Sequence, residues 1–289
     1  MRFTFVHTAD IHLDSPLKGL GAYSQAMADC FRQASRKAFI NLIDAVIERQ
    51  AAFVVIAGDL FDGDWRDYST GLFFIQQMAR LQRARIAVYA LAGNHDAESE
   101  ISRNLRYPDN VRFFSTRKPE TVLHEPTGTR LHGQGFNKRW SLDNIALNYP
   151  PPVRGAFNIG VLHTSCGSSA DHAPYAPCTV EQLRNHGYQY WALGHIHAYA
   201  VLCEAPYIVY PGNLQGRHVR ERGAKGYCVV EVTDGEVSFF EHVYCDVARW
   251  CELTVRISDD DCPDMDTLLE RIRVEICEAA ARADGLPLA

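Results

Sequence analysis

The first 110 residues alternate between short apolar runs and longer amphipathic stretches. Apolar runs of strand length lie at residues 3–8, 53–57 and 86–91. Between them, apolar positions recur at helical spacing over residues 24–49 and 68–82. The order strand, helix, strand, helix, strand predicts an α/β fold with buried strands.

Beyond residue 110 the pattern changes to shorter strands separated by glycine and proline. Strands are predicted at residues 129–135, 157–163, 188–193, 227–233 and 237–243. The connections include the proline run at residues 150–152 and a turn at Asp234-Gly235. The second half of the chain is therefore expected to add strands rather than long helices.

Polar residues of the kind that bind metals follow five of these strands. Along the chain they are Asp10, His12, Asp59, Asn94, His163, His195 and His197. Ligand sites in α/β sheets gather at the carboxyl ends of strands. We therefore expect the five strand ends to converge on one site.

Each of these short motifs also has an ordinary structural interpretation. A lone Asp-x-His is usually a turn, and Gly-Asp and Gly-Asn-His-Asp are typical of turns and helix caps. His163 alone could be a hydrogen-bonded core histidine. His195 and His197 alternate along an extended segment and would point to opposite sides unless the chain turns there. The metal interpretation is favoured because all five motifs occur together.

The ligand types favour particular metals. Such a set is consistent with two divalent ions roughly 3.5–4 Å apart, which share one bridging carboxylate and hold a phosphoryl group between them. Imidazole and carboxylate ligands without thiolate suit manganese, iron or zinc. Mn²⁺ is the first choice, with Fe²⁺, Zn²⁺ or Mg²⁺ as alternatives.

Composition places the chain among reduced globular proteins. Its 289 residues, 47% hydrophobic, suit one large domain or a domain with a smaller appendage. The nine cysteines form no Cys-x-x-Cys pair, and neither a leader peptide nor a run long enough to span a bilayer is evident. We expect a cytoplasmic protein.

The net charge of −6 argues against a generally basic nucleic-acid-binding surface. It does not exclude DNA, because bound cations would reverse the local charge at a metal site. A cationic cluster occurs late in the chain, at Arg217, His218, Arg220, Arg222 and Lys225. It is interpreted either as a contact for substrate, through Arg217 and His218 above all, or as a solvated loop.

The motif order resembles that of the calcineurin-like metallophosphoesterase superfamily, in which Asp-x-His, Gly-Asp, Gly-Asn-His-Asp, His and Gly-His-x-His follow one another. That resemblance implies a β-sandwich of two mixed sheets flanked by helices. It also implies one metal bound by Asp10, His12 and His197, a second bound by Asn94, His163 and His195, and a bridge through Asp59. His95 would then be a catalytic residue that binds neither metal, with Asp96 orienting its ring. Asp62 is either a further partner of a metal-binding histidine or a helix cap.

Longer strings are similar to bacterial DNA repair exonucleases of the SbcD type and their YhaO-like branch. They are residues 8–14 (TADIHLD), 58–62 (GDLFD) and 210–217 (YPGNLQGR). The resemblance implies DNA as substrate, a homodimer and an SbcC-like coiled-coil ATPase partner. It also implies a metallophosphoesterase domain over residues 1–245 and the beginning of a capping region over residues 246–289. The residues of that region predict a strand at 250–257 and a helix at 265–283.

The sequence therefore predicts a two-metal-dependent DNA exonuclease of DNA repair, with endonuclease activity left open. One alternative is a phosphodiesterase acting on small nucleotides or other phosphoesters, since the same motifs define the reaction better than the substrate. Another is a non-catalytic scaffold, against which the full ligand set and His95 argue.

Overall fold

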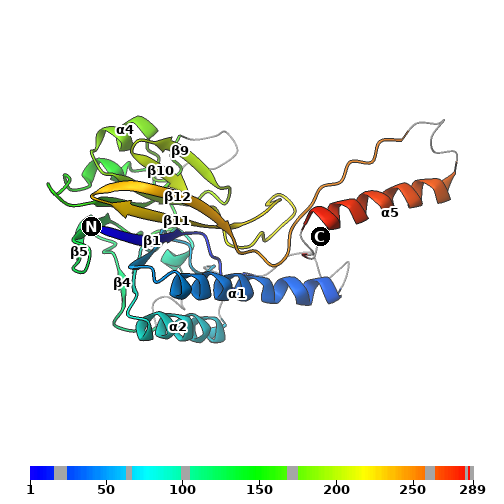
Figure 1. The fold of residues 1–289 in the computed structure, drawn as a ribbon, viewed down its shortest axis with the longest axis horizontal. Coiled ribbons are helices and arrows are strands. Elements are labelled where there is room, and N and C mark those ends of the chain that lie inside the picture. The colour runs from blue at the N-terminus through cyan, green and yellow to red at the C-terminus, as the bar shows by residue number, and fades with distance from the viewer. Residues whose placement is uncertain are drawn as a thin grey trace.

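The computed structural model describes residues 1–15, 25–62, 67–98, 105–167, 175–257, 264–283 and Leu286 (Figure 1). Two six-stranded sheets form a sandwich. In spatial order, the first contains β12 (Glu236–Tyr244), β11 (Gly226–Thr233), β1 (Arg2–Thr8), β2 (Phe53–Ile56), β3 (Ala87–Ala90) and β4 (Val111–Phe113). The second contains β5 (Glu120–His124), β6 (Thr129–Gly133), β7 (Asn158–His163), β8 (Tyr190–Gly194), β10 (Tyr207–Tyr210) and β9 (Ala200–Glu204).

Both sheets are mixed. β1 to β4 are parallel, whereas β11 runs antiparallel to β1 and to β12. β6, β7, β8 and β10 are parallel, with antiparallel strands β5 and β9 at the two edges. The predicted sandwich of two mixed sheets is confirmed.

Helices cover the outer faces of the sandwich. α1 (Gln25–Glu48) and α2 (Tyr68–Arg83) lie below the first sheet in Figure 1, and α4 (Val180–Asn185) lies above the second. Two short 3₁₀ helices, η2 (Asp96–Glu98) and η3 (Ile145–Asn148), also lie within the described residues. No helix within the described residues is long and apolar enough to cross a membrane.

The central strands are buried on both faces, which explains their continuous apolar sequence. In β1, Val6 packs in the cluster beneath α1 and α2, whereas Phe5 belongs to the core between the sheets. The Phe5 ring stacks on Phe53 at 5.2 Å and meets the edge of Tyr190 from the second sheet, also at 5.2 Å. This interior fixes the strands whose ends carry the polar residues.

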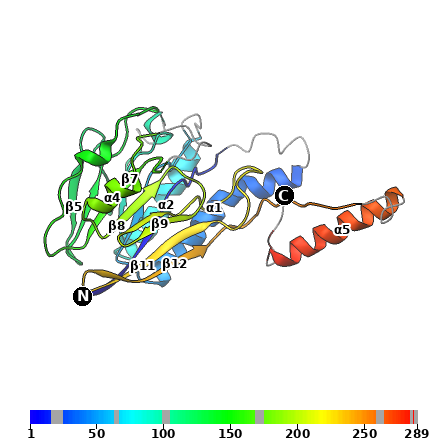
Figure 2. The same cartoon turned by 90° about the horizontal axis from the view of Figure 1, so that it is seen from above.

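The expectations for the C-terminal region are met in part. The predicted helix is confirmed as α5 (Met265–Arg282), which lies apart from the sandwich in both views (Figures 1 and 2). The predicted strand at residues 250–257 is wrong, because this segment is irregular. A strand needs a hydrogen-bonded partner, and Leu253 and Ile257 are exposed here instead of facing a sheet.

Other elements were predicted only roughly or missed. The helix expected at residues 24–49 is α1, although residue 24 lies outside the described residues. β4, β5, β9, β10 and α4 were not predicted, and all have six residues or fewer. Short elements of this kind carry too few residues to show a period.

Candidate metal centre

The polar residues after β1, β2, β3, β7 and β8 meet at one edge of the sandwich. β1 is followed by Asp10 and β2 by Asp59, and the amide of Asp10 donates to the carbonyl of Gly58 at 3.0 Å. Asp10, His12, Asp59 and His195 all have positive φ angles, between 44° and 100°. Residues other than glycine rarely adopt this backbone region, and such strain concentrates at functional sites.

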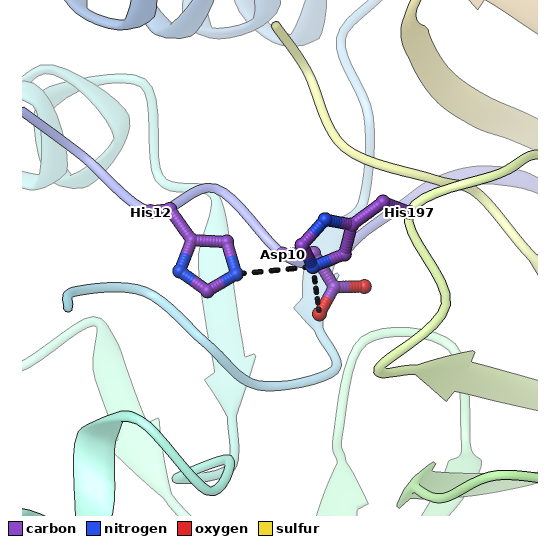
Figure 3. Close-up of side chains that lie close together, drawn as sticks. All are labelled: Asp10, His12 and His197. Carbon is purple, nitrogen blue, oxygen red and sulfur yellow. Dashed lines mark hydrogen bonds and ion pairs between the residues drawn. The ribbon is translucent and has the colours of Figure 1, made fainter. Parts of the chain in front are cut away.

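The first cluster contains Asp10, His12 and His197, whose ligand atoms all lie within 4.8 Å of one another (Figure 3). The two histidine Nε2 atoms are 3.2 Å apart, and His197 Nε2 is 4.0 Å from Asp10. Asp10 and His12 are fully buried. Burial raises the pKa of Asp10 to about 6, against the opposing effect of His197 and His163.

The Nδ1 atoms of both histidine rings in this cluster are hydrogen-bonded to carboxylates. His12 Nδ1 donates to Asp62 at 3.0 Å, and His197 Nδ1 donates to Glu221 at 2.5 Å. In the neutral rings both Nε2 atoms are then unprotonated, so two lone pairs face each other across 3.2 Å. A cation between them removes this repulsion, and these residues therefore fit a metal ion.

The second cluster contains Asp10, Asp59 and His163. His163 Nδ1 donates to the carbonyl of Ala57 at 2.9 Å, and its Nε2 points at Asn94 Oδ1, 2.9 Å away, and at Asp59 Oδ2, 3.4 Å away. Burial alone would lower the pKa of His163, but Asp59 and Asp10 raise it to about 9. The site thus requires a positive charge here, which a proton or a metal ion can supply.

Asp59, a member of the second cluster, also reaches the first, and the remaining predicted ligands lie beside the two clusters. Its Oδ2 is 3.6 Å from His12 Nε2, while its Oδ1 accepts the amide of His95 at 2.9 Å. Burial would raise the pKa of Asp59, but the neighbouring His163 and His12 lower it below its usual range. His195 Nδ1 is 3.2 Å from Asn94 Oδ1. All seven predicted ligands are therefore brought together.

The ring of His95 is oriented by Asp62, and the predicted partner, Asp96, is wrong. His95 Nδ1 lies 3.0 Å from the same Asp62 oxygen that His12 contacts. Burial would lower the pKa of His95, but Asp62 and Asp59 raise it above its ordinary value. The alternative that made Asp62 a partner of a metal-binding histidine is the one that the contacts support.

Asp96 instead ties two loops together. Its buried carboxylate accepts the amides of Leu60 at 3.0 Å, Phe61 at 2.9 Å and Gly93 at 3.0 Å. These donors lie in the loops that follow β2 and β3. Burial and the nearby Asp59 raise the pKa of Asp96 to about 6. Asp96 therefore shapes the loops that carry Asp59 and His95.

The residues of the predicted cationic cluster make different contacts in the structure. Arg217 is directed at carboxylates, with Nη1 3.3 Å from Asp62 and Nε 3.8 Å from Glu221. Lys225 is buried and donates to the carbonyl of His197 at 3.2 Å, and Arg222 pairs with Glu252 at the surface. That Arg217 binds substrate stays a prediction, and the structure adds its ion pairs with the carboxylates around the metal cluster.

A cavity of about 740 Å³ opens above the site. His195, His197, Asn94, Asp59 and His95 lie at its base. It is lined further by Arg139, Trp140, Tyr175, Ala198, His218, Arg220, Glu221 and Lys225. Substrate can therefore reach both clusters and His95 from the same opening.

Glu221 was not predicted from the sequence. It is 7% exposed and accepts from His197, from Asn213 Nδ2 at 2.8 Å and from the amide of Arg217 at 2.7 Å. The only signal in the sequence was one acidic residue among the cations at positions 217–225. That signal does not reveal which distant histidine the carboxylate meets.

Comparison with known proteins identifies the family. The model of the calcineurin-like phosphoesterases matches residues 3–199, more than half of the chain. The chain belongs to the calcineurin-like phosphoesterase family. Members bind divalent metals, in agreement with the donor clusters described above.

Three relatives of this calcineurin-like phosphoesterase are informative. The metallophosphoesterase YhaO of Bacillus subtilis is 38% identical over 240 residues, covering 82% of this chain and 59% of the relative. The DNA double-strand break repair protein Mre11 of Methanopyrus kandleri is 28% identical over 277 residues, covering 86% of this chain and 58% of the relative. The SbcD component of the SbcCD nuclease of Escherichia coli is 28% identical over 123 residues, covering 42% of this chain and 27% of the relative. The chain thus spans at most about three fifths of the length of these relatives.

Proposed function

We propose that this phosphoesterase hydrolyses phosphodiester bonds of DNA with two divalent metals, Mn²⁺ being the first choice. The observation that carries the proposal is the convergence of ring nitrogens and buried carboxylates beneath a cavity that also exposes His95. Asp10, His12 and His197 would hold one metal, Asn94, His163 and His195 the second, and Asp59 both. The bound metals would neutralise the phosphoryl oxygens and activate water.

The protein groups have separate tasks. Asp62 holds the proton of His95 at Nδ1, and its charge favours the protonated ring, which leaves an N–H at Nε2 for the cavity. The side chain of His95 is 31% exposed. We assign it the transfer of that proton to the leaving oxygen. Glu221 and Asp62 keep the rings of His197 and His12 in the orientation that directs Nε2 inward.

DNA is proposed as the substrate because the relatives include a double-strand break repair protein and a nuclease component. The exposed Arg220 at the cavity supplies a cationic group for a phosphate backbone, and the exposed His218 beside it can donate a hydrogen bond. From the same relatives we propose that the protein acts in DNA repair, and that it works as a homodimer together with a coiled-coil ATPase.

Residues 1–245 would form the nuclease domain and residues 246–289 part of a capping region. Hydrolysis of small nucleotides is the second candidate, favoured by the limited cavity volume.

The test is hydrolysis of end-labelled single- and double-stranded DNA beside methyl p-nitrophenyl phosphate, with Mn²⁺ and with chelator. Wild type is compared with His95→Ala and Asp59→Ala. His95→Ala should keep its metals and lose turnover, whereas Asp59→Ala should lose most of its metal and all activity. Ester hydrolysis without DNA cleavage would favour the small-molecule candidate. Metal content unchanged in Asp59→Ala would refute the bridge.

A further inference from the structure

The cavity has an aromatic wall that the proposed chemistry does not use. Trp140 follows β6 and lines the cavity beside Arg139, with 68% of its surface exposed. The other two tryptophans in the described part of the chain are tied down, since Trp191 donates to the carbonyl of Leu183 and Trp250 to that of Gly216. Among the residues that the structure describes, none makes a hydrogen bond or ring contact with Trp140. A large indole exposed next to a metal site is a surface suited to stacking.

The cavity lining also includes a guanidinium, whose positive charge suits the phosphate of a nucleotide. Arg220 and His218 line the same cavity as Trp140, and the side chain of His218 is 53% exposed. The cavity therefore offers a π face, cations and a metal centre in one space. These three features match a nucleobase, its backbone phosphate and the phosphate to be cut.

The cavity is the size of a single nucleotide. A volume of about 740 Å³ lies in the range of pockets for small ligands, on the order of 300–1,000 Å³. A flipped or unpaired nucleotide belongs to this size class, whereas a duplex end does not. A base can stack on an indole only when it has left its own helical stack.

We propose that Trp140 stacks an unpaired nucleobase next to the scissile phosphate, so that the preferred substrates are single-stranded or frayed DNA ends. This inference rests on the proposed nuclease function and names its substrate class. Stacking of one base on an aromatic side chain corresponds to roughly 5- to 150-fold in affinity. Trp140 is thus a specificity-determining residue rather than a catalytic one.

A competing role for the chain segment around Trp140 is contact with a partner protein. Leu142 and Leu147 are 71% and 65% exposed close to Trp140 in the chain. Neither lines the cavity, whereas Trp140 does. A base in the cavity would therefore contact the indole and leave Leu142 untouched, which makes Leu142→Ala the matched control.

The experiment compares wild type, Trp140→Ala, Trp140→Phe and Leu142→Ala on two single strands. One strand is an ordinary oligonucleotide, and the other is identical except that its two terminal nucleotides lack bases. The kcat/KM of Trp140→Ala should fall about 5- to 150-fold on the ordinary strand and remain unchanged on the abasic one. Trp140→Phe should recover part of the loss, and Leu142→Ala should match wild type.

The outcomes separate this inference from the proposed function. Equal rates for wild type and Trp140→Ala on the ordinary strand, or equal losses on both strands, overturn the stacking site while leaving the nuclease intact. A loss shared by Leu142→Ala overturns it in favour of the partner interface. A wild type that hydrolyses methyl p-nitrophenyl phosphate but neither strand overturns the inference together with DNA as substrate.

Discussion

Replacing Glu221 by glutamine should weaken one metal and leave the other. The substitution keeps the shape of a side chain that is 7% exposed but removes the charge 2.5 Å from His197 Nδ1. Outer carboxylates of metal-binding histidines typically contribute 10- to 100-fold in metal affinity. That range equals about 1.4–2.7 kcal/mol of binding free energy. We expect a loss toward the upper end, because Glu221 is little exposed and its contact with His197 is short.

The assay is calorimetric titration of metal-free protein with Mn²⁺, fitted to two sites. Because His197 belongs to the cluster with Asp10 and His12, only that site should weaken. Glu252→Gln is the matched control, since it removes the same charge from a carboxylate that is 58% exposed and pairs with Arg222. Wild-type affinity at both sites in Glu221→Gln, or equal weakening of both sites, would refute the argument.

Two further predictions concern the scaffold. Asp96→Asn replaces one acceptor oxygen of a carboxylate that accepts three buried amides by an NH₂ group, which leaves a buried amide without its acceptor. The free energy of unfolding should therefore fall by about 1–3 kcal/mol in a denaturant titration. An unchanged midpoint with slower turnover would restore the predicted role of Asp96 at His95. Burial lowers the pKa of His7 to about 3 from 6.5, with Nε2 donating to Leu193. The unfolded chain therefore binds the extra proton between these values, and stability is lost as the pH falls below 6.5, by up to about 1.4 kcal/mol per pH unit. The slope of stability against pH should be shallower in His7→Gln than in wild type, and identical slopes between pH 6.5 and 5 would contradict this.

The position of the site could be predicted from sequence because its ligands follow strands that are easy to recognise. β1 and β2 are buried on both faces, so their apolar runs stand out, and the polar residue that follows each marks a strand end. The backbone turn that lets both His195 and His197 face the site was not predictable. It depends on a φ of 100° at His195, whose amide is held by Asp10 from the first sheet.

The partners of the ligands could not be predicted, because they depend on tertiary contacts. Asp96 is adjacent to His95 in the chain, yet its carboxylate is turned toward amides of the neighbouring loop. Glu221 meets His197 from a loop 24 residues away. The sequence presents Arg217 only as one cation among several, and the folded chain brings its guanidinium beside Asp62.

The pairing of β1 with β11 has a consequence for how the protein acquires its metals. Arg2 lies opposite Thr233, so the first strand to be synthesised must wait for almost the last strand of the sandwich before its sheet is complete. Closing so long a loop is slow, and contacts distant in sequence form late in folding. Asp10 and His12 extend from this strand, while His197, which belongs to the same cluster, comes 185 residues after His12 in the chain. A nascent chain therefore holds only fragments of the site, and metal selection is a property of the finished fold.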